Sequence, residues 1–269
     1  EIYDGNQWTG ILATSPELQT GGTRGLFGGG ETPSLTDRID FINVDTTGNA
    51  VDFGDLSISK RNLKSTSDRT RLIFTGGYTS GPAVVYNTLE FVTMASTGNT
   101  ADFGDLTQAR SRHSGFASST RGFAAGGMSS PSPTTPSEVI DFVTIQSTGN
   151  AVDFGNMTSA RLGPSGAQSP TRGLMFGGKD SETRNIIEYV TMSTTGNSAD
   201  FGDLSIATGG EPAGMSSSTR GVYGTGAISP SPGETNTISF ITMASIGNVV
   251  DFGDATVARF SATGLSSPT

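Results

Sequence analysis

Side chains that commonly carry catalysis or hold metal ions are scarce in this sequence. Its 269 residues include no Cys and one His, His113, which excludes disulfides, cysteine nucleophiles and metal sites that need two imidazoles. His113 stands next to Ser114, but adjacent side chains on a strand point to opposite faces, and the sequence has no GxSxG motif. Asp52 and Asp55 also diverge on a strand, which disfavours a shared calcium ion. The sequence therefore predicts no catalytic residue, no metal site, no cofactor and no enzyme.

The charge of the chain narrows the class of partner. Sixteen Lys and Arg stand against 25 Asp and Glu, a net charge of −9, so attraction to nucleic acid or to anionic lipid is not expected. No apolar run approaches the roughly 20 residues that cross a bilayer, so membrane insertion is not expected either. We predict a soluble domain.

Two series of arginines recur along the chain. In the first series each Arg follows a Thr, at Arg24, Arg71, Arg121, Arg172 and Arg220. These arginines could pair with the Asp residues of a recurring DFG motif. The second series follows that motif, at Arg61, Arg110, Arg161 and Arg259. Four basic groups at equivalent places could contact an anionic glycan or another chain, or they could cap loop carbonyls.

The most variable segments of the chain follow recurrent glycine doublets. Aromatic, basic and Met side chains stand out from these polar segments at Tyr78, Tyr86, Met128, Lys179 and Arg184. Equivalent loops of a repeat protein emerge on one face, where the loop chemistry can differ while the scaffold stays constant. We predict these residues as candidate ligand contacts, with solvated loops as the alternative.

A repeat of about 50 residues positions all of these side chains. Its most regular segment reads TGNAVDFGDL in the first copy, and the five copies lie at 47–56, 97–106, 148–157, 195–204 and 246–255. A segment that begins with Thr-Arg and a segment of the type IDFVTI keep step with it. The repeat units are 23–69, 70–119, 120–170, 171–218 and 219–269.

Each unit predicts four short β-strands. The segments are rich in Phe, Ile and Val and are bounded by Gly, Asn, Ser or Pro, which is typical of strands. Residues 140–145 are apolar on both faces, as in stacked sheets. Gly149 and Asn150 predict a tight hairpin turn with positive φ angles. We expect Phe154 and its equivalents to fill the gap between sheets, and Gly155 to permit a bulge in the outer strand.

Four antiparallel strands in each of five units predict an all-β fold, a five-bladed β-propeller of four-stranded blades, with a solenoid as the alternative. The C-terminal residues 266–269 match 168–171, so the last strand has no blade of its own. We predict that this C-terminal strand pairs with the N-terminal blade and closes the ring, which covers two sheet edges. Residues 22–269 would form the propeller, and residues 1–21 a linker or tail segment that could add a strand instead.

Two segments resemble known families. The run ARSRHSGFASSTRGFAAGG (109–127) resembles a kelch repeat, in which Arg and His precede a strand and a second strand ends in two glycines. The kelch pattern also has a Tyr and a Trp after the doublet, whereas here Phe or Tyr lies in the IDFVTI-type segment and the Phe of DFG replaces the Trp. The opening YDGNQWTG (3–10) resembles a segment of phage tail and fibre proteins. These resemblances imply a kelch-like propeller in a viral or phage setting.

We therefore predict a non-catalytic binding module, a viral or phage surface or tail-associated propeller that recognises a host-surface glycan or another virion protein. Its expected location is the virion or an extracellular surface, where it could form part of a larger multimeric assembly. A purely structural virion component and a kelch-type scaffold for protein–protein interaction are the alternatives. A hydrolase would require carboxylates from several blades to converge at the centre.

Overall fold

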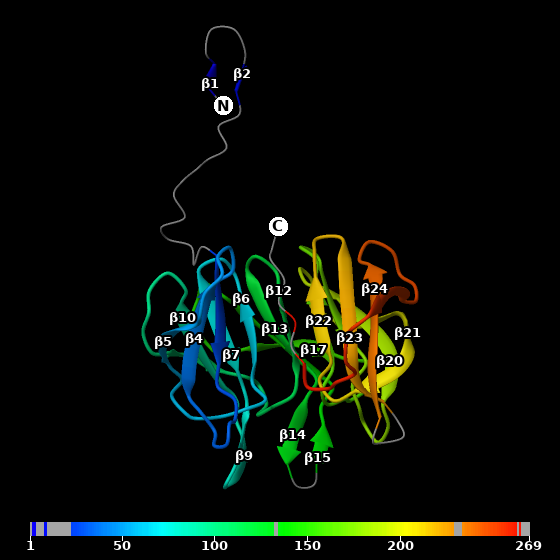
Figure 1. Cartoon of the computed structure of the whole chain (residues 1–269), viewed down its shortest axis with the longest axis horizontal. Helices are drawn as coiled ribbons and strands as arrows, with labels where there is room; N and C mark the ends of the chain where they lie inside the picture. Colours follow the sequence, from blue (N-terminus) through cyan, green and yellow to red (C-terminus); the bar gives the residue numbers. More distant parts are fainter. Residues whose placement is uncertain are drawn as a thin grey trace.

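The computed structural model describes residues 23–131, 134–228, 233–262 and 264, together with strands β1 (Ile2–Tyr3) and β2 (Trp8–Thr9). Every helix or strand assigned in these residues is a β-strand (Figure 1), and the all-β prediction is confirmed. None of the described residues forms a helix that is long and apolar enough to span a membrane. The predicted linker, residues 1–21, lies almost entirely outside the described residues.

The strands form five successive antiparallel sheets that follow the repeat. Sheet 1 contains β3 (Arg24–Gly28), β4 (Arg38–Asn43) and β5 (Val51–Asp55). Sheet 2 contains β6 (Lys64–Ser67), β7 (Arg71–Thr75), β10 (Thr88–Thr93) and β11 (Ala101–Asp105). Sheet 3 contains β12 (Ser114–Ala117), β13 (Arg121–Ala125), β16 (Val139–Thr144) and β17 (Val152–Asn156).

Sheets 4 and 5 are joined. Sheet 4 contains β18 (Ser165–Gln168), β19 (Arg172–Phe176), β20 (Arg184–Thr191) and β21 (Ala199–Gly209). Sheet 5 contains β22 (Ala213–Ser216), β23 (Arg220–Ile228), β24 (Glu234–Thr242) and β25 (Val250–Asp254). The long strand β21 pairs with β23 at Thr208 and Gly209. Two small ribbons complete the fold, β8 (Tyr78–Ser80) with β9 (Ala83–Val85) and β14 (Met128–Pro131) with β15 (Thr134–Pro136).

The first strand of each four-stranded sheet lies at the inner side of the fold. Strands β6, β12, β18 and β22 contact one another in this order. Glycine makes this close approach possible, because a Cβ on Gly115 would lie 2.4 Å from the carbonyl oxygen of Ser65, and one on Gly166 would lie 2.6 Å from that of Gly115. Gly214 and Gly264 repeat this contact, because a Cβ on them would lie 2.3 and 2.6 Å from the carbonyl oxygens of Gly166 and Gly214, respectively. The small, polar composition of these strands therefore reflects tight packing at the inner side.

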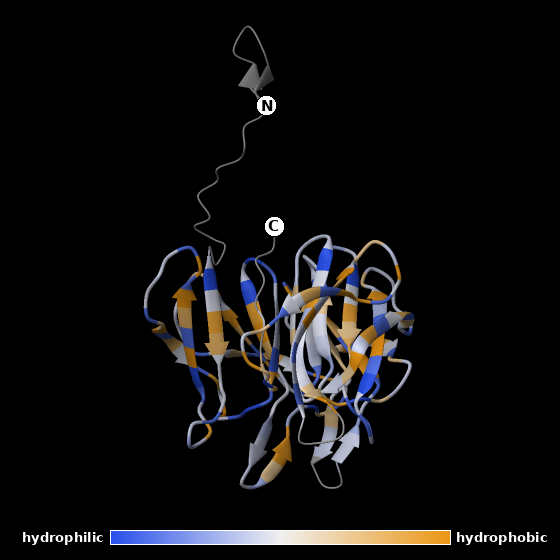
Figure 2. Cartoon of the chain, turned by 45° about the vertical axis from the view of Figure 1, so that its right-hand side comes forward, coloured by the Kyte–Doolittle hydropathy of each residue, from blue (hydrophilic) through white to orange (hydrophobic). Residues whose placement is uncertain are grey.

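The hydrophobic core consists of four clusters, and each cluster lies between two successive sheets. In Figure 2 the hydrophobic colour is concentrated on the strands. The predicted role of the DFG phenylalanines is confirmed at Phe53, Phe103, Phe154 and Phe201, which are 2–3% exposed in these clusters. The predicted bulge is also present, since the register shifts opposite Gly155, between Ile140 and Asp141.

The connection that contains Gly149 differs from the predicted tight turn. Strands β16 and β17 do form a hairpin, but seven residues separate Thr144 from Val152, and only Gly149 has a positive φ, 155°. The N–H of Gly149 donates to the carbonyl oxygen of Phe103 in the preceding sheet, at 2.7 Å. The connection is therefore built to reach the neighbouring sheet, which the local turn chemistry does not reveal.

Closure of the ring is not shown by the described strands. Sheet 1 has three strands, and no described strand pairs it with sheet 5. Figure 1 shows sheet 1 on the left and sheet 5 on the right, with strands of sheet 3 visible between them. The predicted closing strand includes residues 265–269, which lie outside the described residues.

Candidate functional site

The variable connections gather at one end of the sheets, which we call the loop face. Strands β3, β7, β13 and β19 all run towards it, and the ribbons β8–β9 and β14–β15 project from it at the bottom of Figure 1. Residue Arg24, where β3 begins, lies at the opposite end of sheet 1. The candidate loops therefore lie at the end of the sheets that is opposite to Arg24.

A repeated backbone bridge fixes the first residue of three of these loops. Tyr78, Met128 and Lys179 pair with Arg61, Ser111 and Leu162, respectively. In the first bridge the N–H of Tyr78 donates to the carbonyl oxygen of Arg61 at 2.8 Å, and the N–H of Arg61 donates to that of Tyr78 at 3.0 Å. The structure therefore confirms that these loop residues occupy equivalent positions.

Arg61, Tyr78 and Glu31 form a small surface group, the Arg61 cluster. The guanidinium carbon of Arg61 lies 5.5 Å from the centre of the Tyr78 ring, and an Arg61 Nη1–Glu31 ion pair forms on the other side. About one third of each charged side chain is exposed. Tyr86 lies apart from the cluster, with its ring 5.8 Å from the Nζ of Lys60.

The other predicted loop contacts have different environments. Met128 is buried and is not available to a ligand. Lys179 is exposed. Arg184 donates from Nε and Nη2 to the same oxygen of Asp180, at 3.0 and 2.6 Å. These hydrogen bonds hold the pKa of Asp180 at about 2 and raise that of Arg184.

Two of the four arginines in the second series are interior, so these two cannot be surface contacts. Arg110 and Arg161 have no exposed side-chain area and pair with Asp141 and Glu188 of the following sheet. The residue of the first unit that is equivalent to Arg110 is Lys60, not Arg61. The N–H of Gly30 donates to the carbonyl oxygen of Lys60, and in the next unit the N–H of Gly77 donates to the carbonyl oxygen of Arg110.

The fourth and fifth positions of the series break the pattern. Thr208 and Ser239 occupy the fourth position as a buried neutral pair. Arg259 occupies the fifth position and is exposed. In sheet 1, Asp40 holds the strand position that Asp141 and Glu188 hold in sheets 3 and 4.

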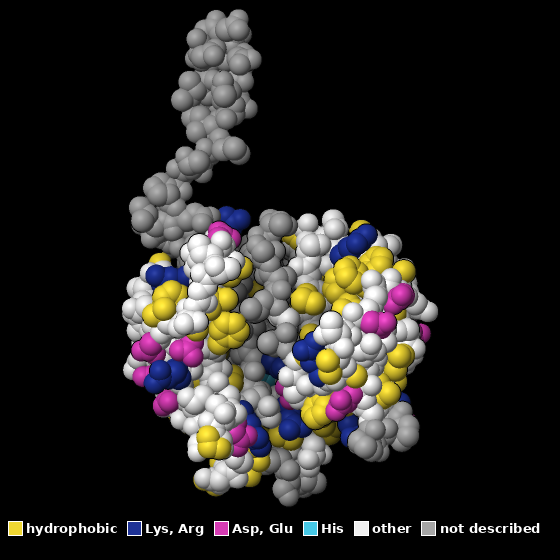
Figure 3. Space-filling view, viewed as in Figure 1, with side chains coloured by type: hydrophobic (Ala, Val, Ile, Leu, Met, Phe, Trp, Pro, Cys, Tyr) yellow, Lys and Arg dark blue, Asp and Glu magenta, His cyan; other side chains and the backbone are white. Residues whose placement is uncertain are grey.

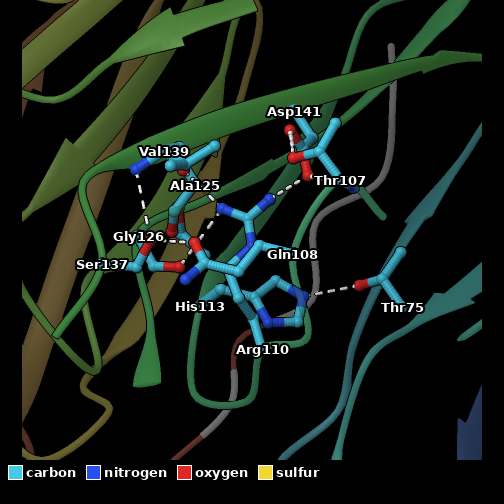
Figure 4. A network of polar contacts seen from close by, with 11 residues as sticks. Thr75, Thr107, Gln108, Arg110, His113, Ala125, Gly126, Ser137, Val139 and Asp141 are labelled. Carbon is cyan, nitrogen blue, oxygen red and sulfur yellow. Dashed lines mark hydrogen bonds and ion pairs between the residues drawn. The ribbon is translucent and has the colours of Figure 1, made fainter. Parts of the chain in front are cut away.

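In each of the three buried ion pairs, the carboxylate also accepts hydrogen bonds from nearby backbone N–H and hydroxyl groups. Lys60 Nζ lies 2.6 Å from Glu90 Oε1, and Glu90 also accepts hydrogen bonds from Ser57 and Thr100. Burial by itself raises the pKa of Glu90, but these hydrogen bonds outweigh it and lower the pKa. In the second network Arg110 donates to Asp141 and to the carbonyl oxygen of Val139 (Figure 4).

These pairs are structural. Arg110 and Arg161 contact a carboxylate with no exposed area, and burial lowers the pKa of each guanidinium while the acidic partner raises it. An ion pair of this kind ties the connection after one sheet to the edge of the next. The capping of loop carbonyls anticipated from the sequence is seen at Gly126, whose carbonyl oxygen accepts a hydrogen bond from Arg110 Nη1 at 3.5 Å.

His113 is buried beside Arg110, with its Nε2 2.6 Å from the hydroxyl of Thr75 (Figure 4). Burial, followed by the charges of Arg110 and Lys64, lowers the pKa of His113 well below 6.5. The imidazole is therefore neutral in the folded chain. Its hydroxyl partner Thr75 is buried with it, and the adjacent Ser114 Oγ contacts the Ala125 carbonyl instead. This arrangement supports a structural role.

His113 should make stability depend on pH. Below pH 6.5 the unfolded chain binds a proton at this site and the folded chain does not, so the free energy of unfolding should fall by about 1.4 kcal/mol per pH unit as the pH decreases. Urea unfolding at pH 7.0, 6.0 and 5.0 measures the slope. The His113→Leu variant, which copies Leu63 at the equivalent position, should lose this contribution. An equal slope in both proteins would contradict the neutral, buried imidazole.

A second surface group, the inner cluster, was not predicted from the sequence. Lys64 Nζ and Arg112 Nε lie 3.1 and 3.4 Å from the two carboxylate oxygens of Glu211. These residues precede or begin the inner strands of three different sheets. The Arg112 side chain contacts Glu211 through Nε, and its two terminal nitrogens have no acceptor among the described residues.

The backbone explains why the inner cluster forms. The residue two positions before each described inner strand has a positive φ, at Asn62, Arg112, Gly163 and Glu211, and Ser261 at the same repeat position has one as well. The N–H of Arg112 donates to the Asn62 carbonyl at 2.9 Å, and that of Gly163 donates to the Arg112 carbonyl at 2.7 Å. These turns therefore lie next to one another, and a non-glycine residue at the same repeat position is the sequence signal that could have identified the cluster.

The first arginine series does not pair with the DFG aspartates. Each Arg lies over an aromatic ring of its own sheet, with 4.6–4.9 Å between the guanidinium carbon and the ring centre. Four of the five also donate to a carbonyl oxygen of the next sheet. Among the described residues, no three Asp, Glu or His side chains group as a metal ion would require.

Comparisons with known proteins inform the fold alone. The chain matches no protein-family model, and it matches no curated protein sequence. Among solved structures, it is similar to the one described as "Structure of YjhT", with a TM-score of 0.75 and 8% sequence identity over 90% of this chain and 84% of that chain. At this level of identity the likeness supports a shared fold.

Proposed function

We propose that this chain is a five-bladed β-propeller that acts as a non-catalytic binding module on a virion or extracellular surface. Its partner is a host-surface glycan or another virion protein. Five sheets at five repeat units support the blade number. The phage-tail resemblance of residues 3–10 supports the setting.

The inner cluster is the observation that carries the binding proposal. A guanidinium whose terminal nitrogens have no acceptor among the described residues presents a planar fork of donors, which suits a carboxylate or sulfate group. Arg112 is 40% exposed while its partner Glu211 is 14% exposed, so a ligand can reach the donors without displacing the ion pair. The Arg61 cluster adds a guanidinium and an aromatic ring to the same loop face. An acidic glycan therefore fits this face better than a neutral one.

Binding to a glycan array tests this proposal. We expect the purified chain to retain glycans that carry a carboxylate or sulfate, and the Arg112→Met and Tyr78→Ala variants to bind at least tenfold more weakly, because each loses a charged or stacking contact. Arg69→Met is the matched control, since Arg69 is exposed in the turn between β6 and β7 at the opposite end of the sheet. Equal loss in all three variants, or no retention of any glycan, would contradict glycan recognition.

A protein partner is the second candidate, and the two projecting ribbons favour it. Strands β9 and β14 lie against each other, and Val84 in the middle of β9 is 36% exposed. Short strands with open edges can add a strand from another chain. A chain that ignores glycans but loses assembly into the virion when Val84 is changed to Asp would support this structural role.

A further inference from the structure

Each pair of successive sheets is joined by the same set of contacts. The most regular of these contacts is a backbone hydrogen bond that we call the backbone clamp. In it, the carbonyl oxygen of the DFG phenylalanine of one sheet accepts a hydrogen bond from the N–H of the TGN glycine of the next. It occurs four times at 2.7–2.8 Å, from Gly98, Gly149, Gly196 and Gly247 to Phe53, Phe103, Phe154 and Phe201. The Asn after each of these glycines accepts a second hydrogen bond from the preceding sheet, at 3.0–3.1 Å.

The first arginine series adds a third contact to each of these interfaces. Arg24, Arg71, Arg121 and Arg172 donate from Nη1 to the carbonyl oxygens of Met94, Ile145, Met192 and Met243, at 2.6–3.1 Å. The accepting residues are themselves buried in the cluster between the two sheets. Each interface therefore joins two different sets of groups: the Arg side chain and the DFG backbone of one sheet, and the TGN segment and an accepting carbonyl of the next.

Both halves of a fifth interface are present but unmatched. Sheet 5 carries Arg220 and Phe252, and sheet 1 carries Val44 at the position of the accepting carbonyl and Gly48 at the position of the donating glycine. Phe252 is 56% exposed and Val44 is 58% exposed, whereas their four equivalents in the matched interfaces are at most 3% and 9% exposed. In Figure 3 hydrophobic side chains lie at the surface on both halves of the molecule, where Figure 1 places sheets 1 and 5.

The charges at these two ends are also complementary. Arg259 occupies the position of Arg110 and Arg161, and Asp40 occupies the position of their partners Asp141 and Glu188. The interface between sheets 4 and 5 has a neutral pair here, Thr208 with Ser239. An Arg at one end and an Asp at the other are what a further charged interface would require.

We propose that these two ends bind each other within one chain. Phe252 packs against sheet 1 and its carbonyl accepts the N–H of Gly48. The Arg220 guanidinium donates to the Val44 carbonyl, and Arg259 pairs with Asp40. The proposal rests on the five-bladed arrangement proposed above and is independent of what the loop face binds.

The position of Gly264 favours the same chain over a second copy. Nine residues separate Asp105 from Gly115, and nine separate Asp254 from Gly264. Gly264 lies against Gly214 as Gly166 lies against Gly115, with a Cβ position 2.6 Å from the carbonyl oxygen in both cases. The chain after sheet 5 therefore follows the inner path to the place of the next inner strand, and sheet 1 is the sheet that has three described strands.

Spin labels can test the proposal, because the chain has no native Cys. The test pair is Thr46→Cys with Val257→Cys, one label on each unmatched end. The control pair is Ser245→Cys with Ile206→Cys, the equivalent positions across the matched interface between sheets 5 and 4. All four side chains are exposed. Double electron–electron resonance on the full chain should give the same distance distribution for both pairs.

Dilution with unlabelled protein separates the outcomes. A test distribution that matches the control and persists after tenfold spin dilution supports binding within one chain. A matching distribution that disappears on dilution would assign the contact to a second copy, and a longer or broader distribution would mean that the ends stay apart. Either of the last two results overturns the proposal, and glycan binding is unaffected by which one occurs.

Discussion

Replacing Arg161 with Thr is expected to destabilise the fold strongly. Arg161 and Glu188 have no exposed side-chain area, and Nη2 of the arginine lies 2.7 Å from Oε1 of the glutamate. Removal of one partner leaves a buried charge without its counter-ion, which costs about 3–5 kcal/mol. Urea unfolding at pH 7 should show a free energy of unfolding lower by this amount.

The chain supplies the matched control for this substitution. The next interface has Thr208 and Ser239 at the equivalent positions, and both are buried. The double variant Arg161→Thr, Glu188→Ser copies this neutral pair, so it should recover most of the loss, since neither charge is then left unpaired. A double variant that is as unstable as the single one would show that the arginine acts through packing rather than through charge.

Replacing Gly104 with Ala should separate sheets 2 and 3. Gly104 has a φ of 142°, and a Cβ there would lie 2.5 Å from the carbonyl carbon and oxygen of Gly149. Backbone strain of about 1–3 kcal/mol and overpacking of about 1–3 kcal/mol both oppose the side chain. The expected loss of unfolding free energy is therefore about 2–6 kcal/mol, which thermal and urea unfolding can measure.

Gly149→Ala separates the two contributions. Gly149 has a similar φ of 155°, but a Cβ at this position would have no atom within 4 Å. This variant should show only the strain, and it should be more stable than Gly104→Ala by about 1–3 kcal/mol. Equal losses would mean that the contact between the two glycine backbones does not limit the spacing of the sheets.

Much of the fold follows from local patterns in the sequence. Short apolar segments between glycines predict the strands, and the constant period predicts equivalent sheets. The burial of Phe154 is predictable for the same reason, since a large apolar side chain recurs beside a glycine that permits a bulge. Each of these features depends on residues close together in the chain, where sequence periodicity is informative.

The candidate site was harder to predict because its contacts are long-range. Lys64 and Glu211 are 147 residues apart in the sequence, and no period joins them. The neighbouring residues Lys60 and Arg61 are both basic, so residue type alone could not show which one enters the interior. Only the backbone bond from Gly30 to the Lys60 carbonyl decides it. The exposed loop residues Tyr78 and Lys179 were found because they follow a recurrent glycine doublet.

The backbone clamp between sheets has a consequence for how such a chain can change. Its donors and acceptors are main-chain groups, and the Asn and Arg side chains that add hydrogen bonds beside it recur at each of the four matched interfaces. None of them belongs to the connections at the loop face. Mutations that change the length or composition of the loop-face connections therefore leave these hydrogen bonds between sheets in place. New specificities can accordingly be grafted or selected one loop at a time, with the cost of each trial confined to that loop.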